Sequence, residues 1–278
     1  MPSFDTPKPI TAVIDLQVGT ARIVATDRTD TEVEVLPANA ASDNDVRDAE
    51  QTTVTCSGGV LTVKAPRRRS PFNKPGAVDV LIGLPAGSEL QGTVGVGDFH
   101  CTGRFGDTRL RSSVGDIRVE EAAGVRLRND LGAIRLERAT AAGEITAAGP
   151  VTVGRVDGTL TVKNGNGDTE LDEVTGALEI SAANGRIEVG TAHADVEAKS
   201  SNGPIRIDRI TRGKVTLRGS VGNIEVGIPA TTAAWVDVHT GVGALRNSLT
   251  DAVGPGDAID TVELRARTTV GDIHIRRA

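Results

Sequence analysis

Basic side chains recur along this 278-residue chain at a fixed distance before a repeating glycine. Lysine or arginine stands four residues ahead of six of ten such glycines, and two adjacent repeats, before Gly115 and Gly132, carry another arginine two residues earlier. Stacked in register, these cations would form a stripe that attracts carboxylate or phosphate groups. The candidate partner-binding stripe consists of Arg109, Arg111, Arg126, Arg128, Lys163, Lys199, Arg218 and Arg267.

A solvated outer face explains the same residues, and the sequence leaves both interpretations open. Long cationic side chains can shield a sheet with their methylene stems while their charged ends stay in water. The stripe is densest in two adjacent repeats, where arginines occupy matched positions: Arg109 and Arg111 in one repeat, and Arg126 and Arg128 in the next. Five nearby glutamates are expected to neutralise much of the stripe: Glu170, Glu179, Glu188, Glu197 and Glu225.

A second basic segment, Arg67-Arg68-Arg69 with Lys74, is interpreted as a solvated loop. Short basic runs can bind nucleic acid or anionic lipid. Here only Phe72 could stack on a base, and the whole chain has a formal net charge of -6 with a pI of about 5.3. Nucleic-acid binding is therefore not expected.

No catalytic residue, metal site or cofactor is predicted, so we expect a protein that is not an enzyme. No nucleophile elbow, P-loop or dinucleotide fingerprint stands in a strand–turn–helix context. The histidines fall in different repeats without the spacing of metal ligands: His100, His193, His239 and His274. Four aspartates follow repeating glycines and are interpreted as turn residues: Asp98, Asp116, Asp168 and Asp272.

The repeat itself predicts the fold. Aliphatic residues alternate with polar ones before and after each repeating glycine, as in strands with one buried face. Ile187/Val189 and Ile205/Ile207 are examples of pairs that follow the glycine. The spacing is 17 to 19 residues over the first seven intervals and then 21 and 28. The repeating glycines are Gly97, Gly115, Gly132, Gly149, Gly167, Gly185, Gly203, Gly222, Gly243 and Gly271.

These features indicate an all-β fold, a parallel β-helix or solenoid with coils of about 18 residues. Each glycine is expected at a sharp corner, where a positive φ favours a residue without Cβ. A weaker third side, as at Val156 to Leu160, suggests a triangular coil, and right-handed winding is expected. Ile187, Ile205 and Ile224 should then lie directly over one another.

Three asparagines precede successive corner glycines: Asn166, Asn184 and Asn202. Their side-chain amides could hydrogen-bond along the stack as a structural ladder. Equally, asparagine tolerates turn conformations. Both interpretations are structural.

The chain is expected to have two parts, an irregular β cap or first coils over residues 1–90 and regular coils over 91–278. The segment Leu16 to Ile23 resembles the repeat, and Ala38 to Gln51 is expected to be an acidic polar loop. No substantial helix is predicted. Residues Gly227 to Trp235 and Leu249 to Ile259 are expected to be insertions in the last coils.

The composition predicts a soluble protein. The four phenylalanines, one tryptophan and absence of tyrosine fit a narrow aliphatic core. No stretch is long enough for a membrane span, and no signal peptide is visible, so a cytoplasmic location is expected. The two cysteines, Cys56 and Cys101, are expected to be reduced. Arg276-Arg277 and the N-terminal prolines are interpreted as protection of the coil ends, which favours a monomer or small oligomer.

The recurrent form "x-Val-x-Gly-x-Leu-x-Val … Asn-Gly-x-Ile-x-Val" is carried by Val174 to Val189 and by Val196 to Ile207. Together with the segment Leu81 to Ser88, it resembles a bacterial family of β-strand-repeat proteins, domain-of-unknown-function family 4097, labelled "putative adhesin". The resemblance covers essentially the whole chain. It implies the repeat architecture and supplies no catalytic residues, and the adhesin label would imply export.

The sequence favours a non-enzymatic structural or interaction protein that presents its solenoid surface to an unknown protein or acidic polymer. Two alternatives stay open. One is a β-helix enzyme acting on polysaccharide, which would need a carboxylate cluster in a groove. The other is a self-assembling cytoplasmic scaffold, in which exposed coil ends pair with one another.

Overall fold

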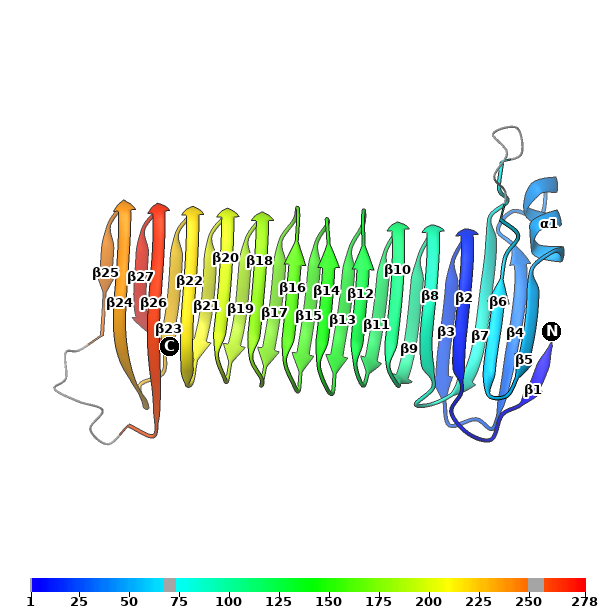
Figure 1. Cartoon of the computed structure of the whole chain (residues 1–278), viewed down its shortest axis with the longest axis horizontal. Coiled ribbons are helices and arrows are strands. Elements are labelled where there is room, and N and C mark those ends of the chain that lie inside the picture. The colour runs from blue at the N-terminus through cyan, green and yellow to red at the C-terminus, as the bar shows by residue number, and fades with distance from the viewer. Residues whose placement is uncertain (1, 68–73, 250–257) are drawn as a thin grey trace. The chain divides into compact units, whose positions relative to one another are not determined.

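The computed structural model describes residues 2–67, 74–249 and 258–278 and is built almost entirely of β-strands (Figure 1). The chain forms two compact units, Met1–Thr140 and Ala141–Ala278. In each unit, the strands that lead into the corner glycines form one sheet, and the strands that leave the corners form another. We call these the pre-corner sheet and the post-corner sheet.

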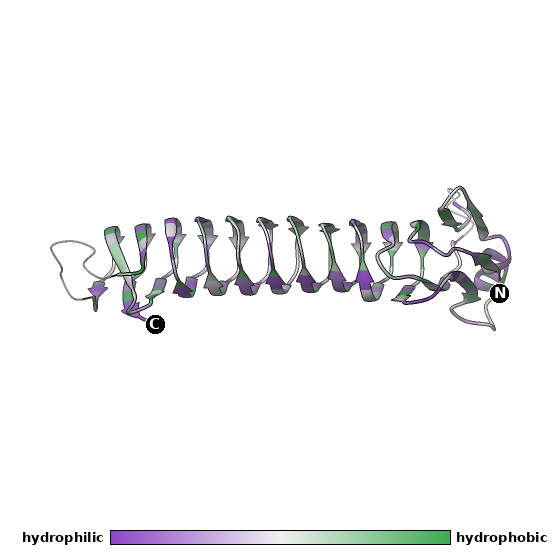
Figure 2. Cartoon of the chain, turned by 90° about the horizontal axis from the view of Figure 1, so that it is seen from below, coloured by the Kyte–Doolittle hydropathy of each residue, from purple (hydrophilic) through white to green (hydrophobic). Residues whose placement is uncertain are grey.

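A single coil shows how the sequence produces this arrangement. β18 (Leu178–Asn184) and β19 (Ile187–Ala192) meet at the corner residue Gly185. Their alternate aliphatic side chains point inward and are at most 6% exposed, while the residues between them face water. Hydrophilic and hydrophobic residues accordingly alternate along the ribbons (Figure 2). Each inward aliphatic contributes about 1.5–3 kcal/mol when fully buried.

Coils stack by parallel pairing with their neighbours. Ile187 is paired with Ile205, and Ile205 with Ile224, so these three side chains form one vertical column. The predicted solenoid of stacked coils is thus confirmed. Each coil has two strands, however, and the predicted third side at Val156 to Leu160 is a short turn. The coil is therefore two-sided, because a turn of this length suffices to connect the two sheets.

The first unit combines regular coils with antiparallel strands. Its pre-corner sheet contains, in spatial order, β12 (Val125–Asn129), β10 (Thr108–Val114), β8 (Glu89–Val96), β2 (Thr11–Val18), β6 (Val60–Lys64) and β5 (Thr53–Ser57). Its post-corner sheet contains β13 (Ile134–Ala139), β11 (Ile117–Ala122), β9 (Phe99–Phe105), β3 (Ala21–Thr26), β7 (Val78–Pro85), β4 (Asp30–Pro37) and β1 (Ser3–Asp5). Antiparallel pairing is confined to β1–β4, β4–β7 and β5–β6 among the described strands.

The second unit consists of parallel coils throughout its described part. Its pre-corner sheet runs β14 (Gly143–Ala147), β16 (Leu160–Asn164), β18, β20 (Val196–Asn202), β22 (Gly213–Val221), β26 (Asp260–Val270) and β24 (Thr232–Val242). Its post-corner sheet runs β15 (Val151–Val156), β17 (Thr169–Val174), β19, β21 (Ile205–Ile210), β23 (Ile224–Ile228), β27 (Ile273–Arg277) and β25 (Leu245–Asn247).

The first unit also contains a short helix, α1 (Asp43–Glu50), where a loop was expected between Ala38 and Gln51. The Ser42 hydroxyl caps this helix by accepting the Asp45 N–H at 3.4 Å. Aspartates in the first turn add a favourable interaction with the helix dipole. The acidic residues that suggested a loop, such as Asp43 and Asp45, therefore stabilise the first turn of a helix.

The last coils do not stack in chain order. In Figure 1 the red strand β26 lies between the yellow β22 and the orange β24, and β27 likewise lies between β23 and β25. The sequence had placed Gly243 before Gly271 in the stack, which is wrong. Burial follows this order: Leu264 and Ala266 of the inner strand β26 are completely buried, whereas Val236 and Val238 of the outermost strand β24 are half-buried.

Corner glycines stack directly on one another. Gly185 has a φ of +117°, and a Cβ atom built on it would overlap the carbonyl group of Gly167 in the preceding coil. The same overlap with the preceding corner occurs at Gly115, Gly132 and Gly203. Glycine is needed at these corners both for its backbone conformation and because no space exists for a side chain.

Small polar side chains lie buried beneath the corners and bind their carbonyl groups. Ser112 Oγ donates to the Gly97 carbonyl at 3.0 Å, Asn129 Nδ2 to the Gly115 carbonyl at 2.7 Å, and Thr268 Oγ1 to the Gly222 carbonyl at 3.1 Å. These hydrogen bonds pair the buried carbonyl groups. A buried carbonyl group left without a partner would cost about 1–3 kcal/mol.

We predict that Gly185→Ala destabilises the protein by about 2–5 kcal/mol, the sum of backbone strain and overpacking. Gly165→Ala is the matched control. Its Cβ would meet only ordinary contacts at 3.7 Å and its φ lies outside the left-handed region, so its effect should stay within about 1 kcal/mol. Chemical denaturation followed by circular dichroism measures both, and equal effects would contradict the explanation.

Candidate partner-binding surface

Four arginines gather on two neighbouring strands of the first unit. On the outer face of the pre-corner sheet, Arg109 of β10 is paired with Arg126 of β12, and Arg111 with Arg128. The side chains of Arg109, Arg111 and Arg128 are 53%, 48% and 54% exposed. We call these four residues the arginine cluster. The structure thus brings together the densest part of the stripe, as the sequence indicated.

Two carboxylates accompany the cluster. Asp130 lies 3.2 Å from both Arg111 Nη2 and Arg128 Nε, and Asp107 lies 3.9 Å from Arg109 Nη2. Partial burial raises the pKa of the Asp130 carboxyl, but the hydrogen bonds from Arg128 and Arg111 outweigh it and hold that pKa below its usual value. Asp130 is therefore ionised at neutral pH and offsets part of the positive charge of the cluster.

The cluster carries an electrostatic cost within the fold. Like charges directly opposite each other on adjacent strands are destabilising, by up to about 1 kcal/mol per pair. The shared carboxylate of Asp130 offsets part of this repulsion for Arg111 and Arg128. An acidic ligand that takes up the remaining hydrogen-bond donors of the exposed guanidinium groups would offset more of it.

The rest of the stripe lies on the pre-corner sheet of the second unit. Lys199, Arg218 and Arg267 are paired in register on β20, β22 and β26, while Lys163 lies on β16 opposite Ser181. Acidic neighbours lie close: Lys199 Nζ is 2.7 Å from Glu197, and Arg267 Nη2 is 3.7 Å from Asp237. Cations and carboxylates therefore lie side by side on this part of the stripe too.

The glutamates expected to neutralise the stripe are divided between the two sheets. Glu179 and Glu197 do lie on the pre-corner sheet beside it. Glu170, Glu188 and Glu225 lie instead on the post-corner sheet, because they follow the corner glycine. There they join an alternating network of ion pairs, in which Arg186, Arg206 and Arg276 bridge successive strands at 2.7 to 3.9 Å.

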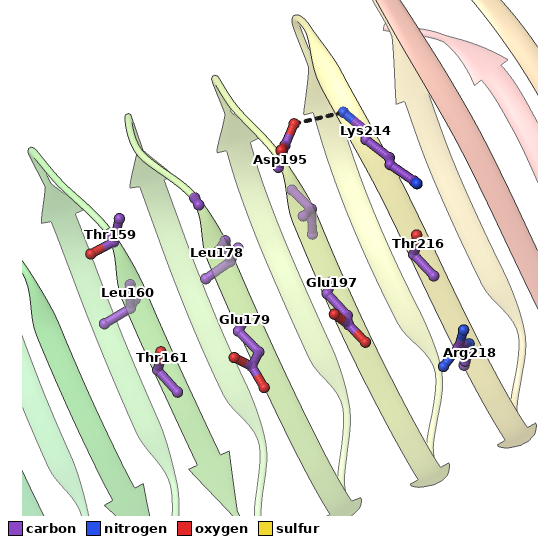
Figure 3. A pocket seen from close by; sticks show the side chains of 12 residues that line it. Thr159, Leu160, Thr161, Leu178, Glu179, Asp195, Glu197, Lys214, Thr216 and Arg218 are labelled. Atoms are coloured by element: carbon purple, nitrogen blue, oxygen red, sulfur yellow. Dashed lines mark hydrogen bonds between the residues drawn. The ribbon is translucent and has the colours of Figure 1, made fainter.

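A shallow groove of about 480 Å³ lies on the pre-corner sheet of the second unit (Figure 3). Glu179, Glu197 and Arg218 from three successive strands line it, with Thr159 and Thr161 beside them. At one end the Lys214 N–H donates to Asp195 Oδ1 at 2.8 Å. The hydrogen bond from Lys199 lowers the pKa of the Glu197 carboxyl. The groove thus mixes both signs of charge.

The aspartates after the corner glycines bind the next coil. Asp98 Oδ1 accepts the Asp116 N–H at 2.7 Å, and Asp116 Oδ1 accepts the Ala133 N–H at 2.9 Å. Asp168 Oδ1 accepts the Arg186 N–H at 2.8 Å in the same way. Sequence reasoning found the turn positions but missed this role, which the recurrence of Gly-Asp at several corners could have suggested.

The three asparagines before the corners are exposed. Asn184 is paired in register with Asn202, and their backbone carbonyls accept the N–H groups of Gly167 and Gly185 at 3.0 Å. A ladder through their side-chain amides stays a prediction. The buried residue two positions before Asn166 is Asn164, whose amide donates to the carbonyls of Gly149 and Gly167 at 3.1 and 2.9 Å.

The remaining candidates are scattered. Arg67 forms an ion pair with Asp15 at 2.7 Å and Lys74 is exposed, whereas Arg68, Arg69 and Phe72 lie outside the described residues. Within residues 2–67, 74–249 and 258–278, no group of three or more His, Cys, Asp or Glu side chains could hold a metal ion. No helix in this described part is long and apolar enough to cross a membrane.

The two cysteines have different surroundings. Cys101 is buried in β9, and burial raises the pKa of its thiol, whereas Cys56 in β5 is partly exposed. We predict that a thiol reagent such as Ellman's reagent modifies one thiol per folded chain and two after unfolding, because the thiolate is the reacting species. Cys56→Ser should remove the fast reaction. Rapid modification of both thiols in the folded wild type would contradict this.

The chain matches one family model and is similar to several solved structures. A family model described as Toastrack DUF4097 matches residues 12–276. A crystal structure of a "putative adhesin" from Parabacteroides merdae is 13% identical, with a TM-score of 0.47 over 100% of this chain and 95% of that one. Another, from Bacteroides fragilis, is 16% identical, with a TM-score of 0.42 over 99% and 95%.

A further crystal structure, of a "putative lipid binding protein" from Parabacteroides distasonis, is 10% identical. Its TM-score is 0.32 over 100% of this chain and 95% of that one. The search of curated proteins gave no match.

Proposed function

The chain belongs to the Toastrack DUF4097 family, and from this premise we propose that it is a non-enzymatic binding protein whose arginine cluster takes up an acidic macromolecule. The observation that carries the proposal is the in-register pairing of Arg109 with Arg126 and of Arg111 with Arg128. Four guanidinium groups therefore lie on one outer face, where Asp107 and Asp130 lie close to three of them.

The geometry suits an extended acidic partner. Neighbouring strands are about 4.8 Å apart and alternate residues along a strand about 6.8 Å apart, so the cluster is a small rectangular grid of cations. Each guanidinium presents a planar fork that can hold a carboxylate or phosphate through two hydrogen bonds. Because the arginines extend from strands, little conformational freedom of the backbone is lost on binding.

Catalysis on polysaccharide is less well supported than binding. Glu179 and Glu197 lie on adjacent strands in the groove, and paired carboxylates are the usual machinery of glycoside hydrolysis. One of the two would have to donate a proton near neutral pH. The hydrogen bond from Lys199 lowers the pKa of Glu197, so this carboxylate stays ionised and suits binding better than proton donation.

We predict that the wild-type chain binds fluorescent poly-L-glutamate or inorganic polyphosphate at an ionic strength of about 20 mM, where screening is weak. The double variant Arg111→Glu/Arg128→Glu should lower the affinity by about tenfold or more, because it replaces attraction by repulsion. Fluorescence anisotropy measures both. A preference for one probe separates carboxylate from phosphate recognition.

The control for this experiment is Arg22→Glu/Arg135→Glu, which makes the same change in net charge on the post-corner sheet of the same unit. Its affinity should fall by less than about threefold, through long-range electrostatics alone. If both double variants lose affinity equally, or if the wild type binds neither probe, the arginine cluster is not a binding site.

We also predict that Asp130→Asn strengthens binding of the same probes several-fold. This change removes an anion that shares hydrogen bonds with Arg111 and Arg128 and leaves an amide of similar shape. Titration by anisotropy, with the melting temperature as a check on folding, measures the effect. Weaker binding by a folded Asp130→Asn variant would show that Asp130 orients the arginines for the ligand.

A further inference from the structure

The reversed order of the last coils changes which residues form the end of the second unit. Arg276 and Arg277 were interpreted as protection of a coil end, but they are the last two residues of β27 (Ile273–Arg277), which lies between β23 and β25. Arg276 pairs with Asp208 and Glu225 at 2.9 and 2.7 Å, and Arg277 Nη1 donates to the Pro229 carbonyl at 2.8 Å. Their charges are therefore used inside the stack.

Among the described residues, the coil that forms this end is β24 with β25, and β24 itself carries few of the features that protect an edge strand. β24 is the last strand of its sheet, eleven residues long, and contains neither proline nor lysine. Trp235 is 55% exposed and Val242 67% exposed, with Arg265 stacked 5.6 Å from the indole centre. A long edge strand with exposed apolar side chains is a template for pairing with another strand.

The inner face of the same coil is also incompletely covered. Val236 and Val238 continue the aliphatic columns of the core but are half-buried, whereas their neighbours on β26, Leu264 and Ala266, are completely buried. Another layer over β24 would therefore continue the columns and remove this apolar surface from water.

The outermost strands of the first unit differ from β24. β1 and β5 each pair antiparallel with their neighbours, and β1 has only three residues. Short, irregular and antiparallel strands are devices that blunt a sheet edge. Within the described residues, β24 is thus the edge best suited to pairing, and a two-fold axis through the contact would bring it against β24 of a second copy.

We propose that β24 pairs antiparallel with β24 of a second copy of this chain, about a two-fold axis at Val238, to give a closed dimer. In this register Asp237 lies opposite His239 of the partner subunit, and His239 lies opposite Asp237 of the partner subunit. Trp235 lies opposite Gly241 of the partner subunit, which leaves room for the indole ring. A register centred on Asp237 would instead place two aspartates opposite each other, which is unfavourable.

Such an interface closes on itself. The same strand is used by both copies, so the contact is isologous and no further edge of this kind is left for a third chain. The assembly is therefore a dimer and not a filament. The proposal is independent of ligand binding, because the arginine cluster lies in the other compact unit.

Size-exclusion chromatography with multi-angle light scattering on the full chain tests the dimer. The wild type should show twice the 28.8 kDa chain mass, falling towards the monomer on dilution. His239→Glu places a carboxylate opposite Asp237 of the partner subunit and should raise the dissociation constant about tenfold or more. The double variant Asp237→Lys/His239→Glu restores opposite charges and should restore the dimer.

Ser181→Glu is the matched control, because it introduces the same charge in the same column on the interior strand β18, and it should leave the mass unchanged. Melting temperatures confirm that every variant is folded. A wild type that is monomeric at all concentrations, a mass that grows without limit, a dimer insensitive to His239→Glu, or no rescue by the double variant would each overturn the proposal.

Discussion

The structure depends on the absence of a side chain at each corner. Because a Cβ at Gly185 would overlap the preceding corner, the distance between coils at that point is set by backbone contact alone. Backbone contact also fixes the register of the strands on both sides of the corner. The aliphatic columns, the buried Ser and Asn residues beneath the corners and the rows of outward side chains all follow from this register.

The fixed register of the strands determines which outward side chains are neighbours on the surface of each sheet. Residues about one repeat apart become neighbours on adjacent strands, so a substitution in one coil acts directly on the coil above and below. Alternation of charge along a column, as on the post-corner sheet of the second unit, gives a closed network of ion pairs. Repetition of one sign, as in the arginine cluster, leaves a field that reaches into solution.

The sequence was sufficient for the repeating part of the fold. Period-two alternation and the spacing of glycines located the strands, the corners and the column of Ile187, Ile205 and Ile224, because each depends on local geometry. The arginine cluster followed from the same register. Glu170, Glu188 and Glu225 were placed on the wrong face only because their relation to the corner glycine was not applied.

Other features could not be obtained from periodicity. Every coil has a similar inward face, so the pattern does not specify which coil stacks on which, and it could not place β26 between β22 and β24. Helix α1 is short and polar, and its fit against β4 and β7 involves tertiary contacts. The side chain of Asp116 accepts a hydrogen bond from Ala133 of the next coil, a contact between coils that the alternation of apolar and polar residues does not report.

The order of the last coils has a consequence for how the second unit is assembled during synthesis. Residues 232–247 leave the ribosome before residues 260–277, yet the later segment occupies the layer between them and the rest of the stack. The earlier segment therefore has no correct neighbour until the later one arrives. Residues 232–247 must therefore stay unpaired, or pair with another strand and later be displaced from it. A nascent chain is most prone to incorrect strand pairing before residues 260–277 have been synthesised.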